Sequence, residues 1–535
     1  MQRRPLLGDE ALALGAINAG ISGAYSYPGT PATEIFEFVC QHTKDWPSVK
    51  DGGVHHVWSA NEKVAYEEAL GMSYAGRRAL VSFKHVGLNV AADPFMNSAV
   101  TGVGGGLVVV SADDPGMHSS QNEQDSRVYA GFALIPCLEP GTQQQAYDMA
   151  VQAYELSERF ALPIMMRMVT RLAHSRAGVQ VGERRAPNTL SLQQDRRRWT
   201  LLPSYSRVLF ERLVDKQKEL VAWSETCEWN KLHLNPAAGR TGYIVAGVAN
   251  NYFLANFDAD EPVPSYLSIG AYPLPKALIR KLFEAVDEVV VIEEGYPVVE
   301  EAIVGVLGSP MGKVVHGRFD GTVPRTGELD PDVVRKALGK SPHAHMEKVA
   351  LPLAPRPPRL CDGCPHVDAY ELIKKVMEEN AGARVFGDIG CYTLGALPPY
   401  DAIHSCVDMG ASISMAMGAS QAGIRPSVCV IGDSTFVHSG MTPLIGAAQQ
   451  NTAMTVFILD NSTVAMTGGQ HTMQTGDPLI RVVKGLGVDP DHLHVLPMHR
   501  KYHDSNMDLV RKELAYDGLS VIITQRECIV AAKKK

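Results

Sequence analysis

Short β-branched runs alternate with helical segments along most of the chain, and this alternation constrains the fold more than any other feature. The early runs include "SGAYSYPG", "RALVSFKHVG", "GGLVVVSADDPG" and "LPIMMRMVTR", with Ala-rich stretches such as "NEKVAYEEALGMSYAG" between them. Later runs include "GYIVAGVAN", "EVVVIEEG", "SVCVIGDS" and "MTVFILDN". Strands that alternate with helices are typical of parallel sheets covered on both faces. The sequence therefore predicts a multi-domain α/β protein built from doubly wound parallel sheets.

The chain has 535 residues, more than one hydrophobic core usually supports, so we expect several domains. A polar, charged stretch, "GERRAPNTLSLQQDRRRW", interrupts the alternation, and the proline-rich "ALPLAPRPPRL" favours an extended linker further on. We therefore predict five segments, which are a first α/β domain at 1–185, a linker at 186–238, a smaller α/β domain at 239–340, a proline-rich linker at 341–360 and a last α/β domain at 361–535.

The charge balance argues against two classes of partner. Lysine and arginine total 50 and aspartate and glutamate total 58, a net charge of −8, so no basic field favours nucleic acid or an anionic membrane. No run approaches the roughly 18 apolar residues that a membrane span requires. We interpret "MQRRPLLGDEALALGAINAG" as the first helix of a cytoplasmic protein, because Asp9 and Glu10 interrupt its apolar stretch.

Polar residues follow two successive strands of the last domain. "GDS" at Gly432 to Ser434 ends one apolar run, and Asp460 and Asn461 end the next. The carboxyl ends of parallel strands meet at one edge of a sheet, where ligands collect near helix N-termini. A carboxylate and an amide there suit Mg²⁺ beside phosphate oxygens. The alternative for "GDS" alone is a strand-to-helix turn with an N-cap.

Several long motifs, in order along the chain, carry a family resemblance. The "GDS" turn and the later "DN" look like the thiamine diphosphate motif, with Ser434 where a glycine is usual. With "YPGTPATEI", "NEKVA", "KHVGLNVAADP", "DDPGMHSSQNEQD", "CDGCPH", "GDIGCYTLG" and "LDNSTVAMTGGQ", they resemble the large subunit of indolepyruvate:ferredoxin oxidoreductase over nearly the whole chain. This resemblance implies a pyrimidine-binding domain, a transketolase-C-like middle domain and a diphosphate-binding domain, and one thiamine diphosphate that lies across two of them. A ferredoxin-like tail follows in that family, whereas this sequence ends seven residues after Cys528, so we expect no such tail.

The resemblance also implies roles for residues of the first domain. Glu62 of "NEKVA" matches the acid that protonates the aminopyrimidine ring, Thr30 of "YPGT" faces the active site, and His85 of "KHVGLN" contacts the substrate carboxylate. The alternative for Glu62 is an exposed helical residue beside Lys63, and the alternative for His85 is a cap on a strand end. His118 and Asn122 of the "DDPGMHSSQNEQD" loop are further candidates.

In the last domain the resemblance implies a Mg²⁺ and phosphate site. Asp433 and Asn461 would bind Mg²⁺ through their side chains, and Thr463 through its carbonyl. The residues that would donate hydrogen bonds to phosphate oxygens or lie close to them are Gly432, Ser434, Thr435, Thr467 and Gly468.

Nine cysteines in a cytoplasmic chain of this size do not suggest a disulfide framework. Cys361 and Cys364 form a C-x-x-C motif, and the resemblance groups them with Cys391 and Cys528 as ligands of one [4Fe–4S] cluster. The alternative is a zinc knuckle or a free dithiol at Cys361 and Cys364, with the other two as core residues.

The resemblance implies oxidative decarboxylation of an aryl 2-oxoacid, such as indolepyruvate, to the acyl-CoA, with electrons leaving to ferredoxin. It implies three kinds of partner, which are a smaller subunit, a separate iron–sulfur carrier and a second copy of this chain within a hetero-oligomer. Two alternatives remain, a non-oxidative thiamine-dependent decarboxylase or carboligase and a catalytically silent cofactor-binding subunit. Glu62 and Asp433 are both present, which disfavours the silent subunit.

Overall fold

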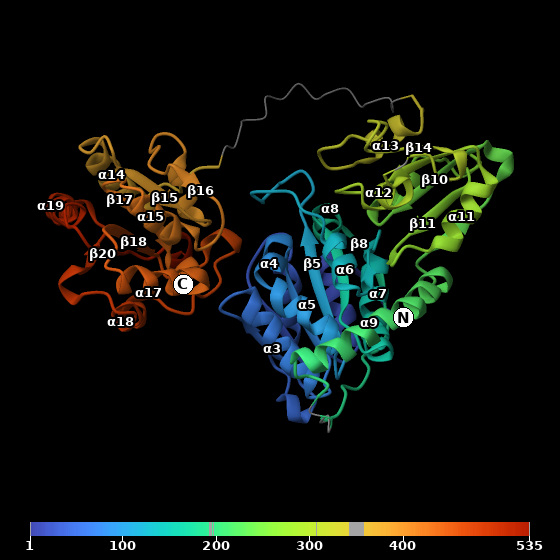
Figure 1. The fold of residues 1–535 in the computed structure, drawn as a ribbon, viewed down its shortest axis with the longest axis horizontal. Coiled ribbons are helices and arrows are strands. Elements are labelled where there is room, and N and C mark those ends of the chain that lie inside the picture. The colour runs from blue at the N-terminus through green and yellow to red at the C-terminus, as the bar shows by residue number, and fades with distance from the viewer. Residues whose placement is uncertain (1, 192–194, 196, 307, 342–357, 534–535) are drawn as a thin grey trace. The chain divides into compact units, whose positions relative to one another are not determined.

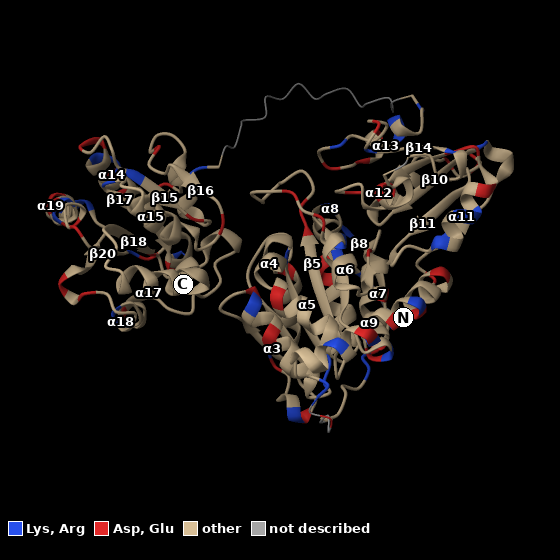
Figure 2. Ribbon diagram, in the orientation of Figure 1, with Lys and Arg blue, Asp and Glu red and all other residues tan. Residues whose placement is uncertain are grey.

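The structure is a computed structural model that describes residues 2–191, 195, 197–306, 308–341 and 358–533 (Figure 1). The chain divides into two compact units, Met1–Val349 and Ala350–Lys535. The division falls inside 341–360, the predicted proline-rich linker, most of which lies outside the described residues. The finer domain boundaries stay a prediction. Acidic and basic residues are interspersed along the ribbons of each unit (Figure 2).

The first unit begins with a seven-stranded sheet of strand order β12-β6-β7-β5-β4-β2-β3. All its pairings are parallel except that of β12 with β6. Every residue of β5 is buried, as expected for a central parallel strand. The strands are β2 (Gly23–Ser26), β3 (His55–Trp58), β4 (Ala79–Lys84), β5 (Leu107–Asp113), β6 (Cys137–Leu138), β7 (Ile164–Val169) and β12 (Ala271–Tyr272).

Helices accompany this sheet. Asn61 caps α3 by accepting the Val64 N–H at 2.9 Å, and Thr142 caps α7 by accepting the Gln145 N–H at 3.2 Å. The helices are α1 (Gly8–Asn18), α2 (Thr33–Thr43), η1 (Val49–Asp51), α3 (Glu62–Tyr74), α4 (His85–Val90), α5 (Ala92–Thr101), α6 (Ser126–Ala133), α7 (Gln143–Phe160) and α8 (Thr170–His174).

The N-terminal segment differs from the expected single helix. Strand β1 (Gln2–Leu7) comes before α1 and pairs antiparallel with β8 (Arg176–Val181). The helix begins only at Gly8, where a Cβ would lie 2.2 Å from the Leu172 carbonyl oxygen. The short polar run "QRRPLL" forms a strand because a distant segment pairs with it, which the local sequence does not indicate.

A smaller five-stranded sheet, of order β14-β13-β10-β11-β9, completes the first unit. Only the edge strand β9 is antiparallel to its neighbour. Both α9 and β9 lie within 186–238, the segment interpreted as a linker. The elements are α9 (Pro203–Thr226), β9 (Lys231–His233), η2 (Pro236–Ala238), β10 (Thr241–Ala246), α10 (Val248–Leu254), β11 (Tyr266–Ile269), α11 (Lys276–Ala285), β13 (Glu288–Ile292), α12 (Val298–Val304), η3 (Pro310–Gly312), β14 (Val314–His316) and α13 (Pro331–Ala337).

The second unit is one six-stranded, wholly parallel sheet of order β16-β15-β17-β18-β20-β19 with its helices. Its elements are α14 (Pro365–Glu378), β15 (Arg384–Gly387), η4 (Cys391–Ala396), β16 (Ser405–Cys406), α15 (Ala411–Gln421), β17 (Ser427–Gly432), α16 (Asp433–Thr435), the π-helical turn η5 (Phe436–Gly440), α17 (Met441–Gln449), β18 (Met454–Asp460), η6 (Ala465–Thr467), α18 (Gly476–Gly485), η7 (Pro490–His492), β19 (Leu493–Pro497), η8 (Arg500–Tyr502), α19 (His503–Leu514), β20 (Leu519–Gln525) and α20 (Ile529–Ala532).

The α/β class and the doubly wound parallel sheets predicted from the sequence are confirmed. Among the helices of the described residues, none has the length and apolar character needed to cross a membrane.

Candidate active site

The carboxyl ends of β17 and β18 bring Asp433 and Asn461 to one edge of the second unit's sheet. The two strands are parallel neighbours, and each of these residues directly follows its strand. Asp433 accepts the Ser434 N–H at 2.7 Å and the Ser462 N–H at 2.9 Å, so the two strand ends are joined through its carboxylate. The predicted convergence of these residues is therefore present in the structure.

Two buried carboxylates lie at this edge. The pKa of Asp433 is raised well above its usual range, because burial disfavours the charged form and Asp460 adds a like charge. Asp460, the last residue of β18, accepts the Gly476 N–H at 2.7 Å and the Ser462 N–H at 3.2 Å. Buried negative charge of this kind favours a bound cation, so the residues fit the predicted Mg²⁺ site.

Asn461 is held by a histidine that we did not assign from the sequence. Its Nδ2 lies 3.1 Å from Nε2 of His366, and its Oδ1 accepts the Thr463 N–H at 3.2 Å. Burial lowers the pKa of His366 to about 4, so its ring is neutral near pH 7 and Nε2 can accept from the amide. His366 belongs to the "CDGCPH" motif, but only the folded chain shows its partner.

Three threonines named from the sequence lie in α16 and in the 462–470 segment, which contains η6. The Thr435 hydroxyl donates to the Ile389 carbonyl oxygen at 3.1 Å, and the Thr463 hydroxyl donates to that of Gln470 at 3.0 Å. Thr467 donates to the Gln470 side-chain oxygen at 2.6 Å. These hydroxyls thus order the loops, which leaves backbone N–H groups as the more available phosphate donors.

Glycine is required at two positions of this edge, for a different structural reason at each. A Cβ on Gly432 would lie 2.7 Å from the Tyr392 ring, so the ring requires a glycine there. Gly468 has a φ of +127°, a conformation that L side chains rarely adopt. Ser434, which replaces the usual glycine of the motif, is half-buried at the start of α16.

The four predicted cluster ligands gather at one end of the second unit. Cys364 is the N-cap of α14 and its N–H donates to the Cys361 carbonyl oxygen at 3.0 Å, whereas Cys391 begins η4. The Cys528 N–H donates to the Asn461 backbone carbonyl oxygen at 3.0 Å, so this cysteine lies next to the sheet edge that carries Asp433 and Asn461. Burial, with the thiols of Cys364, Cys528 and Cys361, raises the pKa of Cys391 to about 12.

The spacing of these thiols is wider than a zinc site requires. In the described residues, no three of these sulfurs all lie within 4.8 Å of one another. Tetrahedral Zn–S bonds of about 2.3 Å would place the sulfurs only about 3.8 Å apart. This spacing concerns sites with three thiols, so the alternative of zinc or a free dithiol at Cys361 and Cys364 stays a prediction.

Glu62 opens α3 in the first unit and is buried, with 5% of its surface exposed. A Cβ on Gly87 of α4 would lie 2.6 Å from the Glu62 Cγ and 2.7 Å from its Oε1, so the side chain packs on that glycine. The alternative of an exposed helical glutamate is wrong, whereas the neighbouring Lys63 is exposed and pairs with Glu67. Gly87 lies in the "KHVGLN" motif, but its contact with Glu62 is not evident from the sequence.

His85 directly follows β4 and is almost completely buried, with 1% of its surface exposed. Neither ring nitrogen has a hydrogen-bond partner, so the alternative of a capping histidine is not supported. Burial and the charge of Lys84 lower the His85 pKa to about 4. A buried, neutral and unpartnered imidazole is suited to receive a ligand group.

Thr30 is linked through Ser119 to Lys84, the last residue of β4. The Lys84 stem passes 3.1 Å from where a Cβ of Gly29 would lie, and its Nζ donates to the Ser119 carbonyl oxygen at 3.1 Å. The Ser119 hydroxyl donates to the Thr30 carbonyl oxygen at 3.2 Å. Burial lowers the pKa of Lys84, with Asp114 and Glu62 opposing that shift. Lys84 is a residue of this edge that sequence reasoning missed.

The loop after β5 is ordered by Asp114, which accepts the Ser119 N–H at 2.8 Å and the Thr170 hydroxyl at 2.7 Å. His118 and Asn122 of this loop are exposed, and the His118 ring lies 3.3 Å from a Glu328 carboxylate oxygen. These two residues are therefore less enclosed than Glu62 and His85.

A buried ionic network connects the end of β5 to the second sheet of the first unit. Arg167 contacts Asp113 at 2.6 Å and Asp125 at 3.2 Å, and Arg127 contacts Asp125 at 2.6 Å. Arg127 also reaches Glu293, directly after β13, at 2.8 Å. This network fixes the base of the "DDPGMHSSQNEQD" loop against the middle domain.

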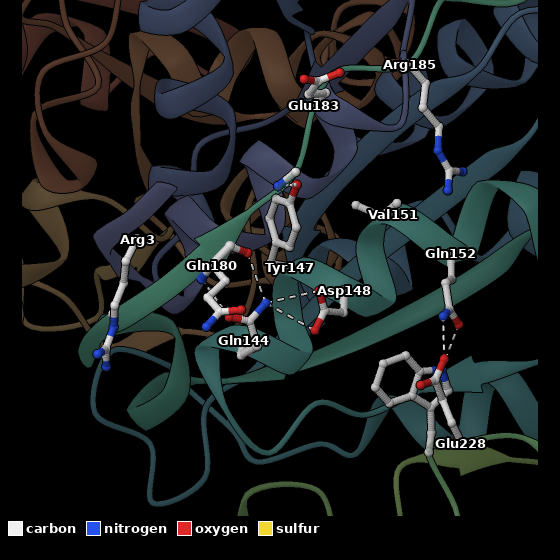
Figure 3. Close-up of a pocket in the computed structure, with 13 residues that line it drawn as sticks. Arg3, Gln144, Tyr147, Asp148, Val151, Gln152, Gln180, Glu183, Arg185 and Glu228 are labelled. Atoms are coloured by element: carbon white, nitrogen blue, oxygen red, sulfur yellow. Dashed lines mark hydrogen bonds between the residues drawn. The ribbon is translucent and has the colours of Figure 1, made fainter. Parts of the chain in front are cut away.

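A pocket of about 760 Å³ lies elsewhere in the first unit, lined by α7, β8 and residues that follow β8 (Figure 3). Gln144 bridges Asp148 and the Gln180 carbonyl oxygen there, each at 3.1 Å. None of the predicted site residues lines this pocket.

Comparison with known proteins places two family models on the chain. The model "Pyruvate flavodoxin/ferredoxin oxidoreductase, thiamine diP-bdg" matches residues 14–206, and "Thiamine pyrophosphate enzyme, C-terminal TPP binding domain" matches residues 388–498. The first range contains Thr30, Glu62 and His85, and the second contains Asp433 and Asn461.

Curated relatives match nearly the whole chain. Indolepyruvate oxidoreductase subunit IorA of Methanothermobacter thermautotrophicus is 37% identical over 98% of this chain and 87% of its own length. IorA of Archaeoglobus fulgidus is 36% identical over 98% of this chain and 86% of its own. Among solved structures, the 2-oxoglutarate:ferredoxin oxidoreductase of Magnetococcus marinus, with 2-oxoglutarate, coenzyme A and succinyl-CoA bound, is similar with a TM-score of 0.51 at 16% identity. That match covers 63% of this chain and 65% of the other.

Proposed function

Because the chain belongs to the indolepyruvate oxidoreductase subunit IorA family of thiamine-diphosphate-dependent 2-oxoacid:ferredoxin oxidoreductases, we propose that it converts an aryl 2-oxoacid to an acyl-CoA. Family membership makes it part of an enzyme that decarboxylates 2-oxoacids oxidatively with thiamine diphosphate. The preference for an aryl substrate, the use of coenzyme A and the transfer of electrons to ferredoxin are what we propose beyond family membership. The IorA similarity over 98% of the chain is the observation that carries it.

Asp433, Asn461 and the Thr463 carbonyl would hold Mg²⁺, and the backbone at Ser434 and in the 462–470 loop would meet the diphosphate. The pair of buried carboxylates at this edge supports the assignment, since a cation would offset their charge. His366 acts as a positioning residue, because its contact with Nδ2 fixes the orientation of the Asn461 amide.

Glu62 would donate a proton to the ring nitrogen of the cofactor's aminopyrimidine. Its burial against Gly87 keeps water away from the carboxyl group and fixes its direction. Thiamine diphosphate, when bound, supplies the carbon nucleophile and the electron sink that decarboxylation of a 2-oxoacid requires. The residues of this chain bind that cofactor, orient it and control its protons.

We assign substrate contact to His85 and to Thr30. The unpartnered ring nitrogens of His85 support this role, because a substrate oxygen could accept from the N–H of the neutral ring. Lys84 lies next to His85 and adds positive charge at the same edge, which favours a carboxylate.

Cys361, Cys364, Cys391 and Cys528 would hold one [4Fe–4S] cluster that removes the reaction's electrons one at a time. The grouping of the four thiols around Cys391 and the hydrogen bond from the Cys528 N–H to the Asn461 backbone carbonyl oxygen support a cluster close to Asp433 and Asn461. Electrons that reach this cluster need an acceptor, so we propose ferredoxin or a separate iron–sulfur subunit as a partner. We also propose a smaller subunit and a second copy of this chain as partners.

The test is to purify the chain anaerobically with its native partners and analyse its thiamine, iron and sulfide. Dye reduction is then measured with indolepyruvate, phenylpyruvate and 2-oxoglutarate, each with and without coenzyme A. The proposal expects bound thiamine, iron with sulfide, and CoA-dependent dye reduction that is fastest with an aryl substrate. Decarboxylation without CoA-dependent dye reduction would support the non-oxidative alternative.

A further inference from the structure

Three helix ends of the first unit meet at a cluster of metal-ligating side chains outside the candidate active site. Asp9 lies in the first turn of α1, Glu34 in the first turn of α2, and His174 ends α8. One donor atom from each residue lies within 4.8 Å of the other two. This is the one group of three or more such ligands at that spacing in the described part of the chain.

Asp9 gives this cluster a reason to bind a ligand. It is 0% exposed, and neither carboxylate oxygen has a hydrogen-bond partner. A buried carboxylate without a partner destabilises the folded state unless its charge is neutralised or compensated. Burial, with the negative charges of Glu34 and Glu10, also raises the pKa of Asp9 well above its usual range.

The neighbouring groups do not supply the missing partner. His174 Nε2 lies 3.6 Å from Glu34 Oε2, an ion-pair distance that is too long for a hydrogen bond. Arg176, the nearby cation, turns to Glu10 at 3.5 Å, and Glu10 also accepts the Leu7 N–H at 2.8 Å. In the described residues, no lysine or arginine forms an ion pair with Asp9.

Two of the three side chains in the cluster are partly exposed to solvent. The Glu34 and His174 side chains are 38% and 36% exposed, whereas Asp9 lies at the bottom of the site. An ion could therefore enter from solvent and bind the buried carboxylate. Water would fill the coordination positions that the protein leaves free.

We propose that Asp9, Glu34 and His174 bind one divalent transition-metal cation of the Zn²⁺ type. Two carboxylates and an imidazole form a ligand set that suits such ions, and the histidine makes Mg²⁺ a poorer match. The site is separate from the Mg²⁺ site assigned to Asp433 and does not rest on the proposed reaction.

The cation would join three segments that are distant in sequence. Gly8, at the start of α1, donates its N–H to the Ser175 carbonyl oxygen at 3.2 Å, next to His174. Thr33, which begins α2, accepts the Gly29 N–H at 3.0 Å. The ion would therefore brace the turn that carries Thr30.

The experiment compares zinc binding in the full chain, with its partners, for wild type and three variants. Asp9→Asn keeps the shape and removes the charge, and His174→Gln removes an exposed ligand with little risk to folding. Glu10→Gln is the matched control, because it neutralises the next acid in the same turn but retains an acceptor oxygen. Each sample is stripped with a chelator, loaded with Zn²⁺, freed of excess metal and analysed for zinc and for its unfolding midpoint.

Wild type and Glu10→Gln should each retain one zinc per chain more than Asp9→Asn and His174→Gln. Zn²⁺ should raise the unfolding midpoint of the first two proteins and leave that of the other two unchanged. All four proteins share the same cysteines, so zinc at those thiols cancels in the comparison. Equal zinc content in all four, or a midpoint shift that persists in Asp9→Asn, would overturn the site and leave Asp9 as a buried, protonated acid.

Discussion

The side-chain Nδ2 of Asn461 lies 3.1 Å from Nε2 of His366, and the backbone carbonyl oxygen of Asn461 accepts the Cys528 N–H at 3.0 Å. One residue thus contacts a histidine next to the C-x-x-C motif and the last of the four grouped cysteines. The proposed Mg²⁺ and diphosphate site and the proposed cluster therefore share this asparagine.

His366→Ala should weaken Mg²⁺ and thiamine diphosphate binding by about 10–100-fold, as expected when a residue that orients a metal ligand is lost. The amide of Asn461 would be free to turn its Nδ2 toward the metal. Cofactor titration by fluorescence quenching measures the effect. His492→Gln, which alters a histidine beside Glu513, is the control. Unchanged affinity in His366→Ala would show that Asn461 needs no such support.

Glu62→Gln should slow hydrogen–deuterium exchange at the cofactor's C2 by about 10²–10⁴-fold, because an amide cannot supply the proton that the ring nitrogen needs. Cofactor affinity should change little. Glu67→Gln alters an exposed residue of the same helix and should exchange at the wild-type rate. Rapid-quench NMR measures the exchange, and an unaltered rate in Glu62→Gln would refute the assignment.

Asp433→Asn should lose Mg²⁺ and thiamine diphosphate together after dialysis against a chelator. The cofactor-free variant should unfold at a higher temperature than the cofactor-free wild type, since a buried charge has been removed. Asp477→Asn, an exposed acid in the first turn of α18, serves as the comparison. Retention of both ligands by Asp433→Asn would place the metal elsewhere.

Cys391→Ala should lower the iron and sulfide content of anaerobically purified protein and abolish dye reduction, because one cluster ligand is lost. Cys406→Ala removes a thiol of the same unit that lies outside the group of four and should keep both. Iron analysis and paramagnetic resonance of the reduced protein distinguish the two. A full complement of iron in Cys391→Ala would exclude that ligand.

Stability should fall as the pH rises from about 4 to about 7, because burial raises the pKa of Glu294 to about 7 in the folded chain. The folded state binds a proton there that the unfolded state releases near its ordinary pKa. The loss would be on the order of 3 kcal/mol for this group. Glu294→Gln, which retains an acceptor for the Leu329 N–H, should flatten the profile of denaturation midpoints against pH. An identical slope in both proteins would contradict the assignment.

The sequence allowed the strands and the site's charged residues to be predicted, because both have local signatures. The buried run before Asp433 reads as a strand, and the polar residue at its end marks the sheet's edge. His366, Gly87 and Lys84 were missed because their importance lies in contacts with residues distant in sequence, which no local pattern encodes. Strand β1 was missed for the same reason, since its pairing with β8 joins segments more than a hundred residues apart.

Strand β12 bears on how the protein can be divided experimentally. Ala271 and Tyr272 come from the second α/β segment but pair with Leu138 and Cys137 at the edge of the first sheet. The Tyr272 hydroxyl also donates to Glu139 at 2.7 Å. A fragment cut at residue 185 would leave that edge uncovered and prone to self-association. Chimeras that exchange the first sheet between relatives should therefore carry this two-residue strand with it.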